Sequence, residues 1–246
     1  MKKILILQMR PEDEAANSEF EAILRVGEIN SNSVHRIRLE QNIPTINLND
    51  YMAIIAGGSP FDVSMQKEKK GQIQLDIETF FHNLFNRIVP IDFPFLGCCS
   101  GNGLLGQYCG VKISTKYPEP IGSVEISVTN EGSKDPLLKG LPLRFSALVG
   151  HKEACEDIPE GAVLLGTSKP CPVQMFRLKK NIYATQFHPE ADANEFILRI
   201  KTYNNHGYFA PEEAQDLITK VSRTNTPVPK EILKRFVRKY TSHSIS

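Results

Sequence analysis

Short runs of apolar residues alternate with amphipathic stretches over the first hundred residues of the chain. Nearly unbroken apolar runs predict strands that are buried on both faces of a sheet, and they lie at residues 4–7, 51–56 and 93–97. An imperfect alternation predicts a further strand at residues 33–39. Apolar residues recur at helical spacing over residues 14–26 and 71–88. This order of elements predicts an α/β fold with a mostly parallel sheet and helices on its faces.

The pattern changes after residue 110, where short apolar segments are separated by Gly, Pro and Asn. They predict a small antiparallel addition and then a return to the main sheet, with strands at residues 111–113, 124–128, 162–165, 173–176 and 182–186. Helical spacing predicts helices over 193–203, 212–221 and 230–240. We expect residues 223–229 to be non-helical because proline restricts the residue before it. We therefore divide the chain into an α/β domain, 1–205, and a helical C-terminal extension, 206–246.

The amino-acid composition and net charge exclude several classes of function but add little to the prediction of the fold. The 246 residues are 41% apolar and 23% charged, which is typical of a folded protein. A net charge of +1, from 29 basic and 28 acidic residues, argues against non-specific nucleic-acid binding, which needs a basic excess. No apolar run reaches the roughly 18 residues of a membrane span, so we expect no membrane partner. Five cysteines without a repeated Cys-x-x-Cys spacing predict no disulfide framework, no metal and a reducing, cytoplasmic location.

The most informative segment surrounds Cys99. A predicted strand runs into Gly97-Cys98-Cys99-Ser100-Gly101, and a helix follows. Gly-x-Cys-x-Gly between a strand and a helix is the pattern of a nucleophile elbow, with cysteine in place of serine. The tight turn and the positive end of the following helix dipole would both favour the reactive thiolate. We predict Cys99 as a nucleophile and Cys98 as a buried core thiol; a purely structural Cys99 is the alternative.

A general base is expected far away in sequence but close in space. His188 follows a predicted strand, and Pro189 stiffens the loop that carries it. This places the imidazole at the carboxyl edge of the sheet, where Cys99 also emerges and where open α/β sheets bind ligands. Glu190 is two residues further on and can orient the imidazole. We therefore predict a Cys99-His188-Glu190 triad.

A glycine turn supplies a third candidate element. Gly57-Gly58-Ser59-Pro60 follows the predicted strand at 51–56. Glycine allows backbone N–H groups to approach a ligand closely. We predict that Gly58 and the N–H of Ser100 bind the oxyanion of a tetrahedral intermediate. By itself, the same pattern is also compatible with an ordinary strand-ending turn.

These three segments, in this order and spacing, resemble the class I glutamine amidotransferases. Within that family the chain is similar to the amidotransferase domain of GMP synthetase and to free-standing relatives, including γ-glutamyl peptidases. The resemblance implies a flavodoxin-like sheet and hydrolysis of a γ-glutamyl amide. It implies Cys99 as nucleophile, His188 as base and Glu190 as its orienter. Attack of the thiolate would release ammonia and leave a γ-glutamyl thioester, which water hydrolyses without a metal or organic cofactor.

Two positions depart from the family pattern. Relatives usually carry a substrate-holding glutamine four residues after the nucleophile, where this chain has Gly103. The segment that contains His151 resembles the second substrate-contact stretch, but Gly150 replaces the usual Ser or Asn. We therefore predict Gly103 and His151 at an altered substrate pocket, although His151 is also compatible with a plain loop histidine.

The sequence leaves three functions open. The chain has no Gly-rich phosphate loop of a synthetase, so ammonia would pass to a separate ammonia-accepting synthetase subunit or diffuse away. The candidates are hydrolysis of free glutamine, hydrolysis of γ-glutamyl peptides or conjugates, and binding without catalysis. The basic face of the predicted helix at 230–240 indicates a helix docked on the domain, with a tail that binds a partner or nucleic acid as the alternative.

Overall fold

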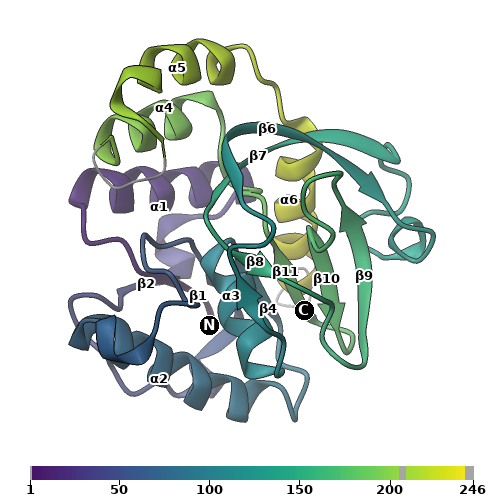
Figure 1. Cartoon of the computed structure of the whole chain (residues 1–246). Coiled ribbons are helices and arrows are strands. Elements are labelled where there is room, and N and C mark those ends of the chain that lie inside the picture. Colours follow the sequence, from purple (N-terminus) through teal and green to yellow (C-terminus); the bar gives the residue numbers. More distant parts are fainter. Residues whose placement is uncertain (1, 205–208, 242–246) are drawn as a thin grey trace.

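The computed structural model describes residues 2–204 and 209–241. Its centre is one twisted sheet with the strand order β2-β1-β3-β4-β11-β10-β9-β6-β7 (Figure 1). The first five strands are parallel and have the flavodoxin-like order. They are β2 (Val34–Arg38), β1 (Lys3–Gln8), β3 (Tyr51–Ala56), β4 (Phe95–Cys98) and β11 (Ile182–Thr185). The predicted fold class is confirmed.

The remaining strands are antiparallel and extend the same sheet beyond β11. They are β10 (Met175–Leu178), β9 (Ala162–Thr167), β6 (Glu119–Val128) and β7 (Arg144–His151). A separate pair joins β5 (Ile113–Ser114) to β8 (Ala154–Cys155). The antiparallel part is therefore continuous with the parallel strands and larger than the sequence predicted.

Helices cover both faces of the parallel strands. Strand β1 shows how, because Leu5 and Leu7 face one core cluster and Ile4 and Ile6 face the other. The first cluster is completed by α2 (Gln72–Ile88) and α3 (Ser100–Tyr108). The second is completed by α1 (Asp13–Gly27) and α6 (Pro227–Thr241). Burial on both faces explains why these strands have unbroken apolar sequences.

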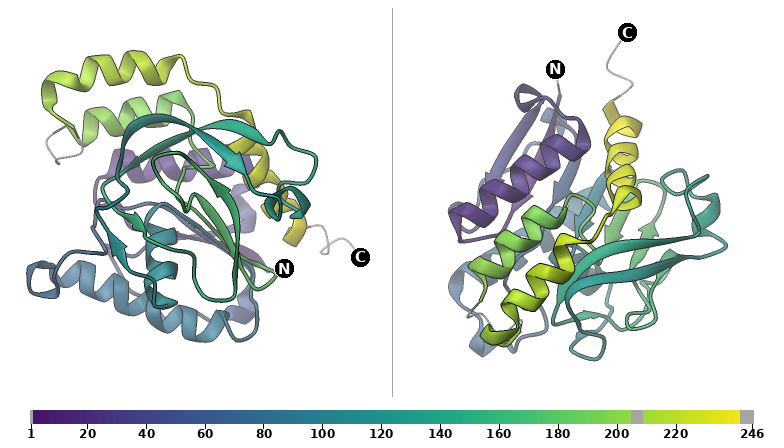
Figure 2. Two further views of the ribbon diagram at one scale, coloured as in Figure 1. Left: turned by 45° about the vertical axis from the view of Figure 1, so that its right-hand side comes forward. Right: turned by 90° about the horizontal axis from the view of Figure 1, so that it is seen from above.

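Helices α4 (Ala193–Thr202) and α5 (Ala214–Ser222) form a third layer beside α1 (Figures 1 and 2). Asp192 begins α4 with a capping box, in which its side chain accepts from Asn194 N at 2.8 Å. Phe196 and Ile200 then pack on Ile121 and Leu148 of the antiparallel strands. This packing fixes the rotation of α4 about its axis. Arg199 of the same helix consequently lies at the carboxyl ends of the parallel strands, with Cys99 and His188.

Strands β7 and β8 were not predicted. Along β7, Ala147 and Val149 face the α6 side of the sheet, while Leu148 is buried against α4 and α5. Because both faces of β7 are covered there, the alternation that identifies a half-exposed strand is lost.

The prediction that residues 223–229 are non-helical is wrong at its end, because α6 begins at Pro227. Proline is tolerated in the first helical turn, where the N–H that it lacks would have no intrahelical partner. Ile232, Leu233 and Phe236 are buried against the sheet. The basic side chains lie on the outer face, where Lys234 and Arg238 both pair with Glu28. Helix α6 is thus docked on the fold.

The predicted boundary between residues 205 and 206 lies outside the described residues. None of the helices over residues 2–204 and 209–241 combines the length and apolar character required to cross a bilayer.

Candidate active site

Cys99 occupies a strained turn between β4 and α3. Its backbone has φ 53° and ψ −101°, a conformation that residues with a side chain rarely adopt. The turn is fixed on both sides: Cys99 N donates to Thr185 O of β11 at 2.8 Å, and its carbonyl accepts from Asn102 N of α3 at 2.9 Å. A Cβ at Gly97 would lie 2.7 Å from the backbone carbon of Gly101. The two glycines therefore permit the close approach that the sequence pattern predicted.

We expect Gly97→Ala to destabilise the protein by about 1–3 kcal/mol, because the new methyl group meets backbone atoms that cannot rotate away. The midpoint of urea unfolding measures this loss at constant m-value. Gly103→Ala is the matched control: its Cβ would lie 3.6 Å from Val63 Cγ2, an ordinary contact, and alanine favours the helix. Equal midpoints for Gly97→Ala and the wild type would contradict a turn that requires glycine.

His188 lies in the loop after β11 and is buried. Its backbone N–H donates to Leu148 O of β7 at 3.1 Å, so the antiparallel part of the sheet holds this loop. The ring packs edge-on against Phe196 of α4 at a centroid distance of 5.5 Å. Its Nδ1 lies 2.8 Å from Glu190 Oε1, and that oxygen also accepts from Arg199 Nη2 at 2.9 Å. The carboxylate and the packing therefore fix the imidazole, and Nε2 remains available for proton transfer.

Burial controls the protonation states at the site. It raises the pKa of the Cys99 thiol to about 11, against the opposing effect of Arg10 and Arg199. Burial likewise lowers the pKa of His188. It acts to raise the pKa of Glu190, but His188 and Arg199 hold that pKa well below its ordinary value. The thiol and the imidazole are thus both neutral at pH 7, while Glu190 is ionised.

The turn and the helix dipole favour a thiolate at Cys99, and burial acts against it. Desolvation of the sulfur outweighs the nearby positive charges. A neutral thiol beside a neutral imidazole still permits nucleophilic attack, because the imidazole can take the proton as the sulfur attacks.

Two cavities meet at Cys99. The Arg10 cavity is lined by Arg10, Cys99, His188, Phe196, Arg199 and Tyr203, among others. The Gly103 cavity is lined by Cys99, Ser100, Gly103, His151, Glu153 and Gln186, among others. Ser59 and Gly150 line both. The structure thus brings Cys99 and His188 to one cavity and Cys99, Ser100, Gly103 and His151 to the other.

The glycine turn after β3 approaches His188 closely. A Cβ at Gly58 would lie 3.0 Å from His188 Cε1 and 2.7 Å from Arg10 Nη2, so a larger residue there would displace the Arg10 guanidinium or the His188 ring. The Gly58 N–H is directed at Glu19 Oε2 at 3.4 Å, and Ser59 N donates to the Ser100 hydroxyl at 2.9 Å. A role for Gly58 as an oxyanion donor therefore requires its N–H to turn away from Glu19.

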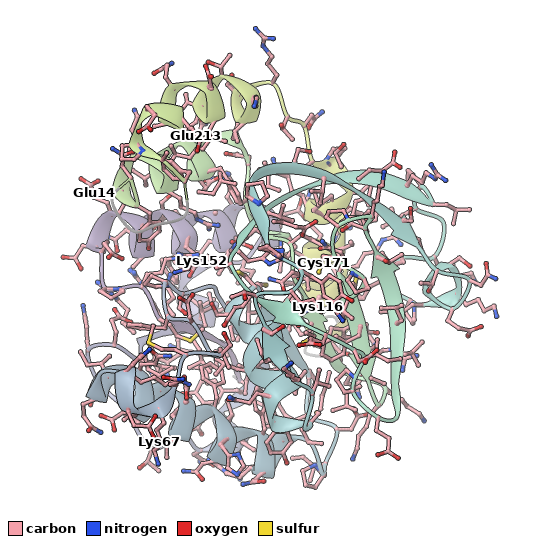
Figure 3. All side chains as sticks on the ribbon, in the orientation of Figure 1. Glu14, Lys67, Lys116, Lys152, Cys171 and Glu213 are labelled. Atoms are coloured by element: carbon pink, nitrogen blue, oxygen red, sulfur yellow. The ribbon has the colours of Figure 1, made fainter. Side chains whose placement is uncertain are left out.

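His151 is buried in a polar network on the far side of the Gly103 cavity. Its Nδ1 lies 2.9 Å from Glu153 O and its Nε2 lies 2.7 Å from Glu119 Oε2. Both ring nitrogens already have partners, so His151 is not positioned as a general base. The Glu153 carboxylate in turn accepts from Val63 N and Ser64 N, which ties the loop after the glycine turn to this network. Lys152, labelled in Figure 3, pairs with Asp62 at the same loop.

One group of potential metal ligands occurs among the described residues. Ligand atoms of Glu119, His151 and Cys171 lie within 4.8 Å of one another (Cys171 is labelled in Figure 3). Glu119 already accepts hydrogen bonds from Gln174 and from the Ser168 hydroxyl. These contacts and His151 satisfy its carboxylate without an ion.

Sequence reasoning missed a buried charged cluster made of Arg10, Glu19 and Arg199. Arg10 Nε donates to Glu19 Oε2 at 2.7 Å, and Arg199 Nη2 lies 3.7 Å from the same oxygen. A signal was present: Glu19 lies on the apolar side of the helix at 14–26, and Arg199 follows Phe196 by three residues and precedes Ile200. Charged residues on the buried face of a helix indicate a pairing or a functional role.

The protein is thus an α/β protein with a flavodoxin-like sheet, a cysteine at a strand-to-helix elbow and a His-Glu pair on the loop after a neighbouring strand. Comparison with known proteins identifies its family. The family model for glutamine amidotransferase class-I matches residues 15–202. The chain therefore belongs to the class I glutamine amidotransferase family.

Three curated relatives are named as glutamine-hydrolyzing GMP synthases or as subunits of one. The chain is 30% identical to one subunit of the glutamine-hydrolyzing GMP synthase of Sulfurisphaera tokodaii, over 60% of this chain and 72% of that protein. It is 34% identical to the glutamine-hydrolyzing GMP synthase of Caldicellulosiruptor saccharolyticus over 45% of this chain, but only 21% of that longer protein. With the corresponding GMP synthase subunit of Methanobrevibacter smithii it shares 34% identity over 42% of this chain and 53% of that protein. The matches to the last two relatives thus span about a fifth and about a half of their lengths.

Solved structures agree on the fold over the whole length. A glutamine amidotransferase from Thermotoga maritima superposes with a TM-score of 0.76 at 20% identity, covering 98% of this chain and 99% of that one. A glutamine amido transferase from Methylobacillus flagellatus gives a TM-score of 0.69 at 18% identity, covering 98% and 96%.

Proposed function

We propose that this chain hydrolyses a γ-glutamyl amide through a Cys99-His188-Glu190 triad. The observation that supports it is the shared cavity, which is lined both by a cysteine on a strained turn and by a histidine whose Nδ1 is held by a carboxylate. His188 takes the thiol proton as the sulfur attacks the amide carbon, and returns it to the leaving nitrogen. Water then attacks the γ-glutamyl thioester, with His188 again moving the proton. No metal or organic cofactor takes part.

We assign the Gly103 cavity to the γ-glutamyl group. Ser100 is the first residue of α3, so its N–H lies among the unpaired donors at the helix N-terminus and serves as an oxyanion donor. Gly58 supplies the second donor once its N–H leaves Glu19. Gly103 leaves space that a substrate fills, and His151 shapes the opposite wall from within its hydrogen-bonded network.

The names of the relatives suggest the biological context. Two of them are single subunits of a glutamine-hydrolyzing GMP synthase. We propose on this basis that a separate synthetase subunit is the acceptor when the released amine is ammonia. The five free cysteines fit a reducing, cytoplasmic location. We further propose that residues 206–246 are a helical extension of the 1–205 domain, docked on it through α6.

A glutamine-like chloroketone at limiting dose is expected to alkylate Cys99 before the other four cysteines, because only Cys99 lies in the cavity that binds the glutamyl group. Peptide mapping by mass spectrometry locates the label. Cys109 is the internal control, since it has intermediate exposure and burial also raises its pKa to about 11, yet it lies at the end of α3 away from the site. Label that appears first on Cys109 would overturn the assignment of the nucleophile.

A further inference from the structure

Two arginines are buried at the Arg10 cavity. Arg10 and Arg199 both line it, and their exposed fractions are only 4% and 5%. Burying a guanidinium is costly unless acceptors surround it. Glu19 pairs with Arg10 and Glu190 pairs with Arg199, so these two contacts explain most of the buried charge. They leave one buried nitrogen of Arg199 without an acceptor in the described part of the chain.

The two arginines differ in how completely their donors are satisfied. Arg10 donates to Glu19 and to the Tyr203 hydroxyl, at 2.7 and 3.2 Å. Arg199 Nη2 donates to Glu190, but Arg199 Nη1 is buried and has no hydrogen-bond partner among the described residues. A guanidinium has five N–H donors in a planar fork that matches a carboxylate. A ligand carboxylate in this cavity would supply the missing acceptor.

The two arginines also act on the sulfur. Burial raises the pKa of the Cys99 thiol, and Arg10 and Arg199 are the charged neighbours that oppose this rise. Ile121 and Phe196 supply an apolar part of the lining, next to the polar Ser59 and Tyr203. The chamber therefore suits a group that has one carboxylate and an aliphatic portion.

The position of His188 decides which part of the substrate enters this cavity. His188 must protonate the leaving nitrogen, so the leaving group lies on the His188 side of Cys99. His188 lines the Arg10 cavity, whereas the residues assigned to the glutamyl group line the other cavity. Both cavities are lined by Cys99. The glutamyl side and the leaving-group side of the amide can therefore occupy one cavity each while the sulfur attacks the carbon between them.

We propose that Arg199 and Arg10 bind the carboxylate of an amino-acid leaving group, so that the substrate is a γ-glutamyl amino acid rather than free glutamine. This inference rests on the proposed function. The Sγ–C bond forms as the C–N bond breaks, and the amino acid leaves with the proton taken from the thiol. Water then replaces sulfur on the carbonyl carbon, which gives glutamate and restores the thiol.

The test compares two substrates that differ only in the carboxylate: γ-glutamylleucine and γ-glutamylleucinamide, with glutamine as the third. The wild type is expected to show a kcat/KM at least about tenfold higher for the acid than for its amide, as expected for a charged hydrogen bond. Leucine is expected to inhibit as a product more strongly than leucinamide. Equal kcat/KM for the acid and the amide would overturn the inference.

The variant Arg10→Gln with Glu19→Gln replaces a buried ion pair by two neutral amides, which avoids leaving a lone buried charge. The acid-to-amide ratio of kcat/KM is expected to fall below about threefold, whereas a merely structural defect would lower both values together. Arg144→Gln is the control, because Arg144 is exposed at the start of β7 and pairs only with Glu125 among the contacts described. A ratio that survives in the double variant would contradict the role of Arg10.

The outcomes separate this inference from the function on which it rests. Hydrolysis of glutamine without a preference for the acid would overturn the inference and leave the amidohydrolase function standing. No turnover of any of the three compounds by the folded wild type would overturn both.

Discussion

Cys99→Ala and His188→Ala are each expected to reduce kcat/KM by roughly three to six orders of magnitude with any γ-glutamyl amide that the wild type cleaves. Without Cys99 no thioester forms. Without His188 the thiol, whose pKa burial raises to about 11, has no base to take its proton at pH 7. The double variant should lose little more than either single variant, because the two groups act in the same step. Steady-state release of glutamate measures all three.

Two controls accompany this experiment. Cys98→Ala should retain turnover, since Cys98 is buried in the core on the α1 and α6 side of the sheet. Glu190→Gln should have a smaller effect than His188→Ala, because it keeps the shape that orients the ring. Near-normal turnover in His188→Ala would require another base, and both nitrogens of His151 already have partners.

The elements around the candidate nucleophile were predictable because their sequence signals are local. An apolar run that ends in Gly97-Cys98-Cys99-Ser100-Gly101 specifies a strand, a tight turn and a helix within a few residues of one another. The placement of Cys99 and His188 at one cavity also followed from local signals. Both residues follow predicted parallel strands, and the carboxyl ends of such strands lie at one edge of the sheet.

Features that depend on distant partners were not predictable. The ionisation of Cys99 depends on how far the finished fold shields the sulfur from water, an effect that opposes the turn and the helix dipole. The Arg10 cavity draws on the segment after β1, on β6 and β7 and on α4, while Glu19 of α1 pairs with its two arginines. No motif links these elements in the sequence. Strand β7 was missed because α4 and α5 cover a face that is exposed in a simpler sheet.

Gly103→Gln is expected to raise kcat/KM for free glutamine about ten- to a hundredfold. The physical reason is the roughly 1.5–3 kcal/mol of a hydrogen bond to a charged substrate group, which the family resemblance assigns to a glutamine at this position. The structure accommodates the change: Gly103 lies on α3 at the Gly103 cavity, and its first new atom would only touch Val63 Cγ2 at 3.6 Å.

Gly103→Ala is the matched control for this change, because it adds the Cβ without the amide and should leave glutamine a poor substrate. The measured quantity is the ratio of kcat/KM for glutamine to kcat/KM for γ-glutamylleucine, in the wild type and both variants. The Gln side chain also occupies space beside Cys99. We therefore expect kcat/KM to rise for glutamine, which gains a hydrogen-bond partner, and to fall for γ-glutamylleucine, which needs more space. A wild type that already cleaves glutamine faster than any γ-glutamyl peptide would show that Gly103 has not altered specificity. Other residues of the Gly103 cavity would then hold the glutamyl group, and Glu153 and Gln186 would be the first to test.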